Sequence, residues 1–518
     1  MSQMQQTTTS SLTQKLARNT TANYAGSFIT LGIGFLLTPF LVRSLGDAQY
    51  GLWILLGSFI AYFQLLDLGL STSLARYVAQ YTGQGRENEL SELASTVFAL
   101  YLGLAAIAGV LMLVLAPWIP TIFNIAPQDA SLATQTFILE AIDFAIMLPT
   151  SLYNAILVGY QRIDLNNIAN VVAQALEAVL IVVLLQRGYG LVAVAGISIV
   201  STIVLAGGRL YFIRRTAPQL KLSLRRARRA TARQIFGYSA AVFVIQISGL
   251  VLLRTDTIIL GLLYPVETIT AYAVPYKLAN MLALLVAPFA AVLFPAYAEM
   301  HGRLDHARLR KLYLEGSKVV ALLCGLMLTF LLIVGVDVLT LWIGPEYQNA
   351  GPILYPLAIF FAILAFTRPG GNLLVATGKA RLRMFIALLQ IVVNLSLCVA
   401  LAIRWAGTGL AVANALSVLF VNVLLMLPLV NRELGLSHRA VLWQLLRPVL
   451  WPMIATAAFL FLAQKWLPIS NWGVVAFDVA GSSLIFGLTY LLLGASAQDR
   501  ANYFLRARRI VNHAQAKP

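Results

Sequence analysis

The segment LASTVFALYLGLAAIAGVLMLVLAP, residues 93–117, contains no charged side chain and decides the class of fold. A run of about 20 apolar residues is long enough to cross the hydrocarbon core of a bilayer as a helix. The whole chain has a similar character, since 59% of its 518 residues are hydrophobic and 11% are charged. Soluble domains carry about 25% charged residues. The sequence therefore predicts an integral membrane protein.

Apolar segments of bilayer length recur fourteen times along the chain. A helix satisfies its own backbone hydrogen bonds in lipid, whereas a β-barrel would show alternating apolar and polar residues, which these runs lack. We therefore expect an all-α integral membrane fold with 14 transmembrane helices. The predicted spans are residues 22–42, 51–74, 93–117, 134–159, 167–186, 191–212, 237–262, 269–297, 317–341, 353–376, 385–403, 410–430, 448–467 and 473–494.

Basic residues gather on one side of these spans. If the N-terminus is inside and the side alternates, 30 of the 37 Lys and Arg residues lie on the inner side, four lie on the outer side and three lie within spans. Cytoplasmic loops carry an excess of Lys and Arg, so we expect both termini in the cytoplasm. The net charge of +17 then reflects topology, with attraction to anionic membrane lipids as a second role. The polar N-terminus predicts no cleaved signal peptide.

The longest inner loop, residues 213–236, carries eight basic residues and lies between the sixth and seventh spans. Shifted by 219 residues, the chain aligns with itself without a gap over 157–200, with Gly159 on Gly378. Two six-helix lobes related by a pseudo-twofold axis along the membrane normal are a known transporter plan. The predicted parts are a cytoplasmic tail (1–21), an N-lobe (22–212), the basic inter-lobe loop (213–236), a C-lobe (237–430), a C-terminal helix pair (431–494) and a basic cytoplasmic tail (495–518).

Several short motifs resemble those of bacterial polysaccharide-biosynthesis flippases of the Wzx type, in the multidrug/oligosaccharidyl-lipid/polysaccharide exporter superfamily. The motifs are LGDAQYGLW at 45–53, LDLGL at 66–70, ARYVA at 75–79, GYQR at 159–162, RTD at 254–256 and AY at 271–272. The resemblance implies a flippase of the bacterial inner membrane. It would move an undecaprenyl-pyrophosphate-linked oligosaccharide to the outer leaflet by alternating access, alongside other polysaccharide-assembly membrane proteins. It also implies that spans one, two, seven and eight line the cavity.

Polar side chains within the predicted spans are the candidates for substrate contacts, because a charge at mid-bilayer costs about 2.5–3.5 kcal/mol. Two cations on adjacent spans suit a pyrophosphate. The alternative for Arg254 is an ion pair, for example with Asp67, and Arg43 and Arg76 have the alternative role of anchors at span ends. The substrate-binding candidates are Arg254, Lys277, Asp67, Gln64, Gln246, Tyr272, Tyr276, Asn280, Arg43 and Arg76.

Four acidic side chains within the spans are candidates for a coupling-ion site, namely Asp256, Glu140, Asp143 and Glu177. Their alternative role is hydrogen bonding between helices. We expect transport to be coupled to the membrane potential, H⁺ or Na⁺, with no bound cofactor. In the tenth span, Pro369, Gly370 and Gly371 predict a hinge, with a plain kink as the alternative.

The motifs of ATP binding, of serine hydrolases and of zinc proteases are absent from the sequence, so neither catalytic nor metal-binding residues are predicted. The basic loop lacks interleaved aromatic residues, which disfavours nucleic acid as a partner. A membrane-embedded polymerase, ligase or glycosyltransferase of the same pathway would need a large outer segment, and the predicted outer loops are short. Within transporters, a lipid II flippase and a multidrug exporter remain the alternatives to a polysaccharide flippase.

Overall fold

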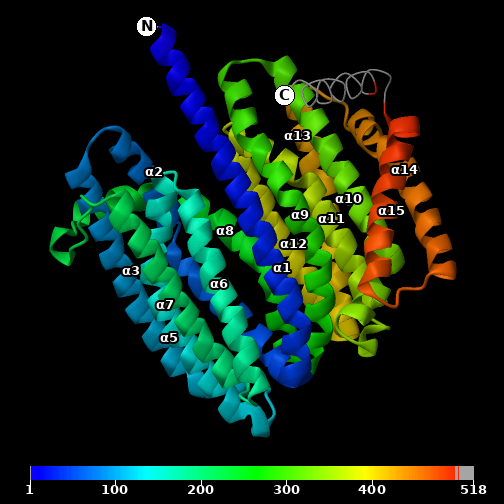
Figure 1. The fold of residues 1–518 in the computed structure, drawn as a ribbon, viewed down its shortest axis with the longest axis horizontal. Coiled ribbons are helices and arrows are strands. Elements are labelled where there is room, and N and C mark those ends of the chain that lie inside the picture. The colour runs from blue at the N-terminus through cyan, green and yellow to red at the C-terminus, as the bar shows by residue number, and fades with distance from the viewer. Residues whose placement is uncertain (1, 496–499, 501–518) are drawn as a thin grey trace, which may run out of the picture. The chain divides into compact units, whose positions relative to one another are not determined.

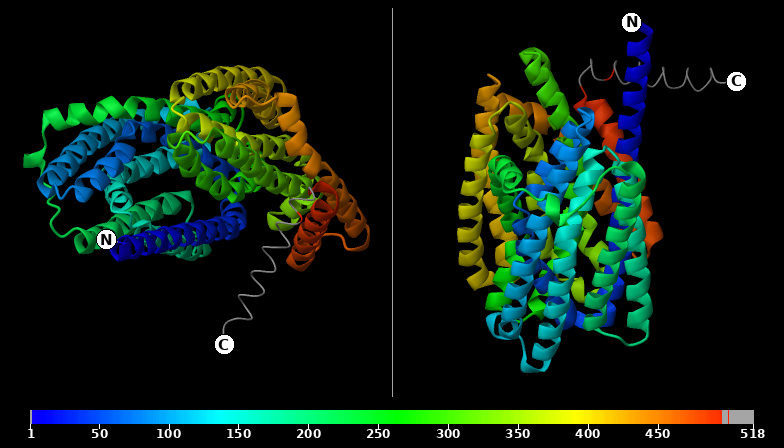
Figure 2. Two further views of the ribbon diagram at one scale, coloured as in Figure 1. Left: turned by 90° about the horizontal axis from the view of Figure 1, so that it is seen from above. Right: turned by 90° about the vertical axis from the view of Figure 1, so that its left-hand side faces the viewer.

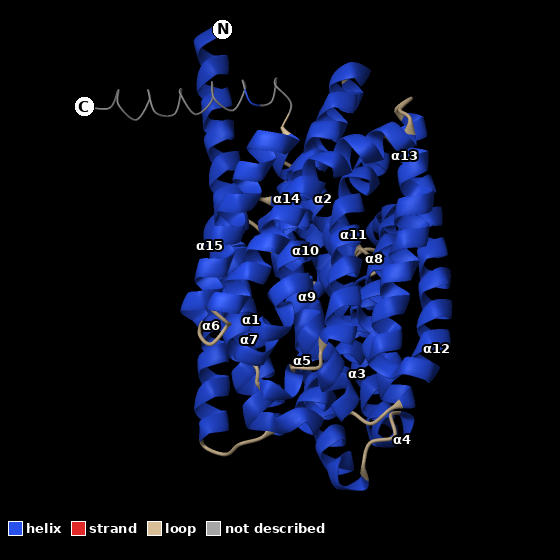
Figure 3. Ribbon diagram, turned by 90° about the vertical axis from the view of Figure 1, so that its right-hand side faces the viewer, coloured by secondary structure: helices blue, strands red, loops and turns tan. Residues whose placement is uncertain are grey.

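The computed structural model describes residues 2–495 and 500, with the side chains of 2–25, 27, 234–242, 244 and 245 left out. Throughout these residues the backbone forms helices joined by short turns, and Figure 3 contains no strand within them. The predicted tail 495–518 lies almost entirely outside this range. The contacts divide the chain into two compact units, Met1–Ala273 and Val274–Pro518. The expected all-α membrane class is confirmed.

The first unit contains eight helices and the start of a ninth (Figure 1). The bundle of α3, α5, α6 and α7 runs side by side in the views of Figures 1 and 2, with direct α3–α5, α5–α7 and α6–α7 contacts. Helix α8 contacts α1, α2 and α3. The helices are α1 (Ser2–Phe63), α2 (Leu70–Gly83), α3 (Glu87–Leu115), α4 (Ile119–Ile122), α5 (Pro127–Gly159), α6 (Ile163–Gln186), α7 (Leu191–Thr216) and α8 (Arg229–Leu263).

The second unit begins within α9 and contains the remaining helices. Helix α11 contacts α10 and α12, while α14 contacts α10 and α15. A buried cluster that includes Tyr297, Tyr313 and Leu374 forms part of its core. The helices are α9 (Glu267–Gly302), α10 (His306–Trp342), α11 (Gly351–Ala376), α12 (Ala380–Val418), α13 (Leu427–Glu433), α14 (His438–Trp466) and α15 (Trp472–Thr489), with π-helical turns at Leu419–Met426 and Tyr490–Gly494.

Twelve helical segments among the described residues are long and apolar enough to cross a membrane. Two of them are much longer than one crossing requires, namely Phe28–Asp67 and Ala380–Glu433. The first bends sharply at Gly46 and the second at Trp405 and Ala406, where the backbone leaves helical geometry. Each divides at its bend into two segments of about 18 residues or more, which suffice for a bilayer, so these twelve segments are compatible with fourteen crossings, and the exact count stays a prediction.

The turns that end α5 and α11 have the same hydrogen-bond pattern. At the turn after α5, the Tyr160, Gln161 and Arg162 N–H groups bond to residues 156, 158 and 157. The pattern recurs after α11 at residues 377–379, with left-handed residues at Gln161 (φ 58°) and Gly378 (φ 77°). It also recurs after α2, α9 and α13, so it is a common helix ending and sets no register for the internal repeat, which stays a prediction.

The two glycines that the predicted repeat aligns have different physical causes. Gly159 ends α5 where it meets α2, and an added Cβ would lie 2.5 Å from the Val78 Cβ. Gly378 has open space around it and is needed for its positive φ. The match of Gly159 with Gly378 therefore does not reflect a shared local role, and the repeat over residues 157–200 stays a prediction.

The motif at 45–53 is explained by close packing within the first unit. Gly51 faces the backbone at the start of α9, and an added Cβ would lie 2.1 Å from the Val266 carbonyl oxygen. The Thr270 hydroxyl donates a hydrogen bond of 2.6 Å to the Asp47 carbonyl oxygen in the same region. Tyr50 is fully buried. These residues therefore hold helices together by close packing.

The basic inter-lobe loop is fastened to the start of α3. The Ser91 and Ser95 hydroxyl oxygens accept hydrogen bonds from the Lys221 and Ser223 N–H groups, at 3.2 and 3.1 Å. The Thr96 hydroxyl oxygen accepts from the Arg228 N–H at 3.1 Å.

The Glu92 carboxylate adds two further contacts to this fastening. It accepts a hydrogen bond from the Thr231 hydroxyl at 2.7 Å and pairs with the Arg228 guanidinium at 3.3 Å. The loop is thus an integral part of the first unit. The contact division falls at residue 273, beyond α8, and the lobe boundaries drawn from the sequence stay a prediction.

Candidate functional site

The second predicted span, 51–74, is interrupted in its middle. A 3-10 turn at Gln64–Asp67 is followed by Leu68 and Gly69, whose φ angles of 51° and 74° are left-handed, and α2 then begins at Leu70. Such a break leaves the first N–H groups of the new helix without partners along the chain. The interruption therefore needs side chains to satisfy it.

The Asp67 carboxylate bonds to hydrogen-bond donors at the break. It accepts hydrogen bonds from the Ser71 N–H at 3.3 Å, from the Ser71 hydroxyl at 2.9 Å and from the Tyr101 hydroxyl on α3. A carboxylate that binds the first turn of a helix also interacts favourably with the helix dipole. Asp67 therefore caps α2 and ties it to α3.

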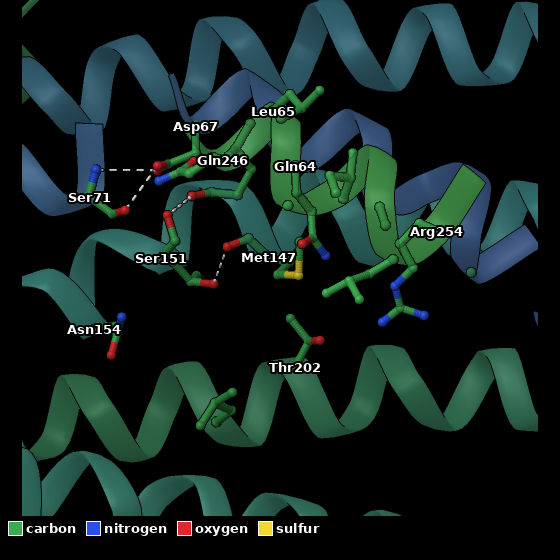
Figure 4. A pocket seen from close by; sticks show the side chains of 18 of the residues that line it. Gln64, Leu65, Asp67, Ser71, Met147, Ser151, Asn154, Thr202, Gln246 and Arg254 are labelled. Atoms are coloured by element: carbon green, nitrogen blue, oxygen red, sulfur yellow. Dashed lines mark hydrogen bonds between the residues drawn. The ribbon is translucent and has the colours of Figure 1, made fainter. Parts of the chain in front are cut away.

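A cavity of about 790 Å³ opens beside this break within the first unit. Its lining comes from α1, α5, α7, α8 and the interrupted segment (Figure 4). Four of the predicted substrate-binding residues meet there: Gln64, Asp67, Gln246 and Arg254. Ser71, which lies seven residues after Gln64 on the face predicted from helical spacing, also lines the cavity. Polar residues that the prediction missed share the lining, namely Thr150, Ser151, Asn154, Thr202 and Arg209.

Arg254 extends from α8 into this cavity, away from Asp67 in the view of Figure 4. Among the described residues, its guanidinium has no hydrogen bond or ion pair, and the side chain is exposed. Asp67 is already bound by three donors. The ion pair between Arg254 and Asp67 that the sequence left open is therefore not formed in this structure.

The two residues that follow Arg254 hold α8 in place. The Thr255 hydroxyl is hydrogen-bonded to the Tyr62 hydroxyl of α1. Asp256 is 2% exposed and accepts a hydrogen bond of 2.5 Å from the Tyr272 hydroxyl. Asp256 and Tyr272 thus pack α8 against the start of α9 and lie outside the cavity lining, while Arg254 faces the cavity.

Arg209 is the main cavity residue that sequence reasoning missed. Its Nε–H and Nη2–H groups donate to the side-chain oxygens of Asn166 and Asn170 on α6, at 2.9 and 3.0 Å. From its position in the sequence, Arg209 is expected to lie at the inner end of its span. The signal that marks it is a polar stripe, since Thr202 and Arg209 lie seven residues apart on α7, opposite Asn166 and Asn170.

The three acidic candidates of α5 and α6 form one electrostatic group. Glu140 interacts with the charges of Asp143 and Glu177. Glu177 accepts a hydrogen bond of 2.9 Å from the Ser201 hydroxyl, whereas Glu140 Oε1 and Asp143 Oδ1 are buried without a partner among the described residues. The described part of the chain contains no cluster of three His, Cys, Asp or Glu side chains placed to hold a metal ion.

The other candidates lie elsewhere. Lys277, Tyr276 and Asn280 belong to α9 in the second unit, where the Tyr276 ring packs on Phe361 with ring centres 5.1 Å apart. A shared phosphate site of Arg254 and Lys277 stays a prediction. Arg43 and Arg76 are exposed and do not line the cavity.

The predicted hinge residues lie within an unbroken helix. Helix α11 continues through Pro369, Gly370 and Gly371, all of which are buried. A Cβ added to Gly370 would meet the Leu427 side chain at 3.3 Å, and one added to Gly371 would meet the Arg383 Nε at the same distance. Close packing explains both glycines, and the hinge stays a prediction.

The sequence matches the family described as "Polysaccharide biosynthesis protein" over residues 16–301, which is more than half of the chain. The chain belongs to this family. The proteins that it resembles are those expected for a Wzx-type flippase of the multidrug/oligosaccharidyl-lipid/polysaccharide exporter superfamily.

Two curated relatives span most of the chain. It is 22% identical to the uncharacterized membrane protein EpsK of Bacillus subtilis, covering 96% of this chain and 98% of the relative. It is also 22% identical to a putative O-antigen transporter of Shigella flexneri, covering 79% of this chain and 96% of the relative.

Solved structures share the fold at low sequence identity. The lipid II flippase MurJ in an inward closed conformation matches with a TM-score of 0.70 and 12% identity, over 95% of this chain and 99% of that one. An inward-facing multidrug transporter of the MATE family matches with a TM-score of 0.66 and 14% identity, over 79% and 94%. These likenesses show that the chain shares the fold of these two proteins.

The contrast between Asp67 and Arg254 predicts that only the Asp67 substitution lowers stability. Asp67→Ala leaves the hydrogen-bond donors of Ser71 and Tyr101 without their acceptor, which should lower the free energy of unfolding by about 1–3 kcal/mol. Arg254→Gln removes no contact among the described residues and should leave stability unchanged. Thermal unfolding of the purified variants in detergent measures both. An equal loss for Arg254→Gln would show that Arg254 has a structural partner.

Proposed function

We propose that this protein is a flippase that moves a polyprenyl-pyrophosphate-linked oligosaccharide from the cytoplasmic to the outer leaflet, for surface polysaccharide synthesis. The observation that carries the proposal is the exposed Arg254 guanidinium, which has no partner among the described residues and lines a polar cavity between membrane-spanning helices. A guanidinium binds phosphate oxygens through two parallel hydrogen bonds, which are strong where water is scarce. Family membership supports the polysaccharide pathway.

The charges that line the cavity favour an anionic substrate over a cationic drug. The sequence left this choice open because it placed Asp67 and Asp256 against Arg254 and Lys277. In the first unit, Asp67 is taken up by three hydrogen-bond donors and Asp256 lies outside the cavity lining, while Arg254 and Arg209 both line it. A multidrug exporter is therefore the weaker alternative, and a lipid II flippase differs only in the attached glycan.

A transporter also fits better than a membrane-embedded enzyme of the same pathway. The Shigella flexneri relative is described as a transporter, and the solved structures that share the fold are described as a flippase and a transporter. The described residues place no large segment outside the helices that could carry catalytic acids and arginines. We propose alternating access as the mechanism, without nucleotide and without bond chemistry on the substrate.

The proposed location is the bacterial inner membrane, with both termini in the cytoplasm. The excess of basic residues on one side supports this orientation. Anionic lipids are the proposed partners of the basic loop, in which Arg225 and Arg226 are followed by the contact of Arg228 with α3. Other polysaccharide-assembly membrane proteins are further partners that we propose from the family alone.

Orientation can be measured at Arg225. A cysteine introduced there, in a variant with Cys324 and Cys398 replaced by Ala, should resist a membrane-impermeant maleimide in intact cells and react after permeabilisation. Asn124, in the short turn between α4 and α5, is the matched outer position and should react in intact cells. Labelling at 225 from outside would reverse the proposed orientation.

The export function can be tested through Arg254. In cells that need this protein for surface polysaccharide, Arg254→Ala should keep normal protein levels and reduce export by about tenfold or more, because a hydrogen bond to a charged group is worth about 1.5–3 kcal/mol. Arg254→Lys keeps the charge without the fork of the guanidinium and should lose less. Normal export by a well-expressed Arg254→Ala variant would contradict the phosphate role.

We further propose that the membrane potential drives transport, with H⁺ or Na⁺ as a coupling ion. A potential that is negative inside favours outward movement of negative charge by about 2.3 kcal/mol per charge per 100 mV. Glu140, Asp143 and Glu177 are the proposed coupling group, because buried carboxyl oxygens without partners suit a proton better than a metal ion.

Energy coupling can be measured in proteoliposomes with a fluorescent pyrophosphate-linked lipid. An imposed potential of physiological sign should accelerate transfer, and Glu140→Gln should weaken the response to a proton gradient. Asp337→Asn, in α10 of the second unit, serves as a carboxyl control outside the group. A transfer rate that does not change when both potential and ion gradients are collapsed would contradict this coupling.

A further inference from the structure

Arg209 is held in a way that fixes its position while leaving its charge intact. An arginine side chain has N–H donors and no acceptor, so the two asparagines must present their carbonyl oxygens to it. Asn166 and Asn170 lie one turn apart on α6, and Asn166 is 7% exposed, so both carbonyl groups face the same guanidinium. The two neutral amides thus hold the guanidinium in one position.

No carboxylate neutralises Arg209 within the part of the chain that the structure describes. None of the ion pairs among these residues involves it, and its two hydrogen bonds go to amides. Arg209 lies near the end of its span, where a basic side chain commonly serves as an anchor, but here it lines the cavity and binds two neutral amides. Since a guanidinium has five N–H donors, three remain beyond the two that the asparagines bind.

Arg209 and Arg254 line the same cavity at different depths. The basic inter-lobe loop connects the end of α7 to the start of α8. The depths of Arg209 and Arg254 can therefore be compared by counting residues from the ends of the two helices that lie away from this loop. Arg209 lies 18 residues from Leu191 at the far end of α7, and Arg254 lies nine residues from Leu263 at the far end of α8. At 1.5 Å per residue, Arg209 is about 13 Å nearer to the loop side.

We propose that Arg209 is a second phosphate-binding residue of this cavity, which receives the pyrophosphate near the basic loop before it reaches Arg254. This inference rests on the proposed flippase function. Two cationic positions along one path hold a charged group at both depths, so that it never crosses the low-dielectric region without a partner. Neutral amides suit such a residue, because a carboxylate in their place would compete with the phosphate for the guanidinium.

The exchange of one amide for a carboxylate provides the sharpest test. Asn170→Asp keeps an acceptor for Arg209 Nη2 and should therefore keep or strengthen the α6–α7 contact, but it cancels the positive charge. Arg209→Gln removes the charge directly. Asn167→Asp is the matched control, since it adds the same charge three residues away on α6, where the Asn167 side chain packs near Gly26.

Binding of undecaprenyl pyrophosphate to the purified protein in nanodiscs is the measurement, with undecaprenol as the uncharged probe. We expect Asn170→Asp and Arg209→Gln to bind undecaprenyl pyrophosphate about tenfold more weakly than the unaltered protein. Binding of undecaprenol and the thermal unfolding midpoint of Asn170→Asp should not change. Asn167→Asp should bind both probes normally, and Arg209→Lys should recover part of the loss.

The outcomes separate this inference from the proposed function. If the unaltered protein binds undecaprenyl pyrophosphate no better than undecaprenol, the proposed function loses its basis. If it does prefer the pyrophosphate but Asn170→Asp binds it normally, Arg209 is only a clamp between helices and the inference is overturned. Equal displacement by phosphatidylglycerol would assign the site to bulk lipid and also overturn it, while displacement by inorganic pyrophosphate would support it.

Discussion

The first unit depends on a rule of the bilayer interior, namely that every backbone polar group must find a partner within the protein. The chain breaks a span at residues 64–69, and the Asp67 carboxylate supports the break by accepting hydrogen bonds from the backbone N–H and the hydroxyl of Ser71. The Tyr101 hydroxyl bonds to the same carboxylate and fixes the break against α3. A polar cavity beside this break is a direct result, since Gln64, Asp67 and Ser71 line it from an interrupted helix.

Charged side chains around the cavity fall into two groups: some are held by hydrogen bonds to neighbouring helices, and others face the cavity. Asp67, Asp256 and Glu177 each accept a hydrogen bond from a neighbouring helix, so their positions are set by packing. Arg254 lies two residues before Asp256 on the same helix, yet it faces the cavity and makes no such contact among the described residues. Spacing along the helix is what assigns the two roles, because residues two apart point to different sides.

The class of fold was predictable because hydropathy is summed over whole spans and does not depend on neighbours. The break at 64–69 was not, because Leu65, Leu66 and Leu68 keep that window apolar and the break relies on Tyr101, 34 residues away. Gln64, Asp67, Gln246 and Arg254 were found by helical spacing on spans that the family resemblance placed at the cavity. Arg209 was missed because its role depends on asparagines about 40 residues away on another helix.

The fastening of the basic loop to α3 has a consequence for how the chain is made. It joins Ser91, Ser95 and Thr96 to backbone N–H groups about 130 residues later, so these hydroxyl oxygens cannot accept those hydrogen bonds until that part of the chain has been synthesised. Contacts between residues so distant in sequence form late and slowly. This edge of the first unit therefore closes only after α7 has been inserted, and until then the Ser91, Ser95 and Thr96 hydroxyl oxygens lack these N–H donors. The delay lasts at least as long as translation from residue 96 to residue 231.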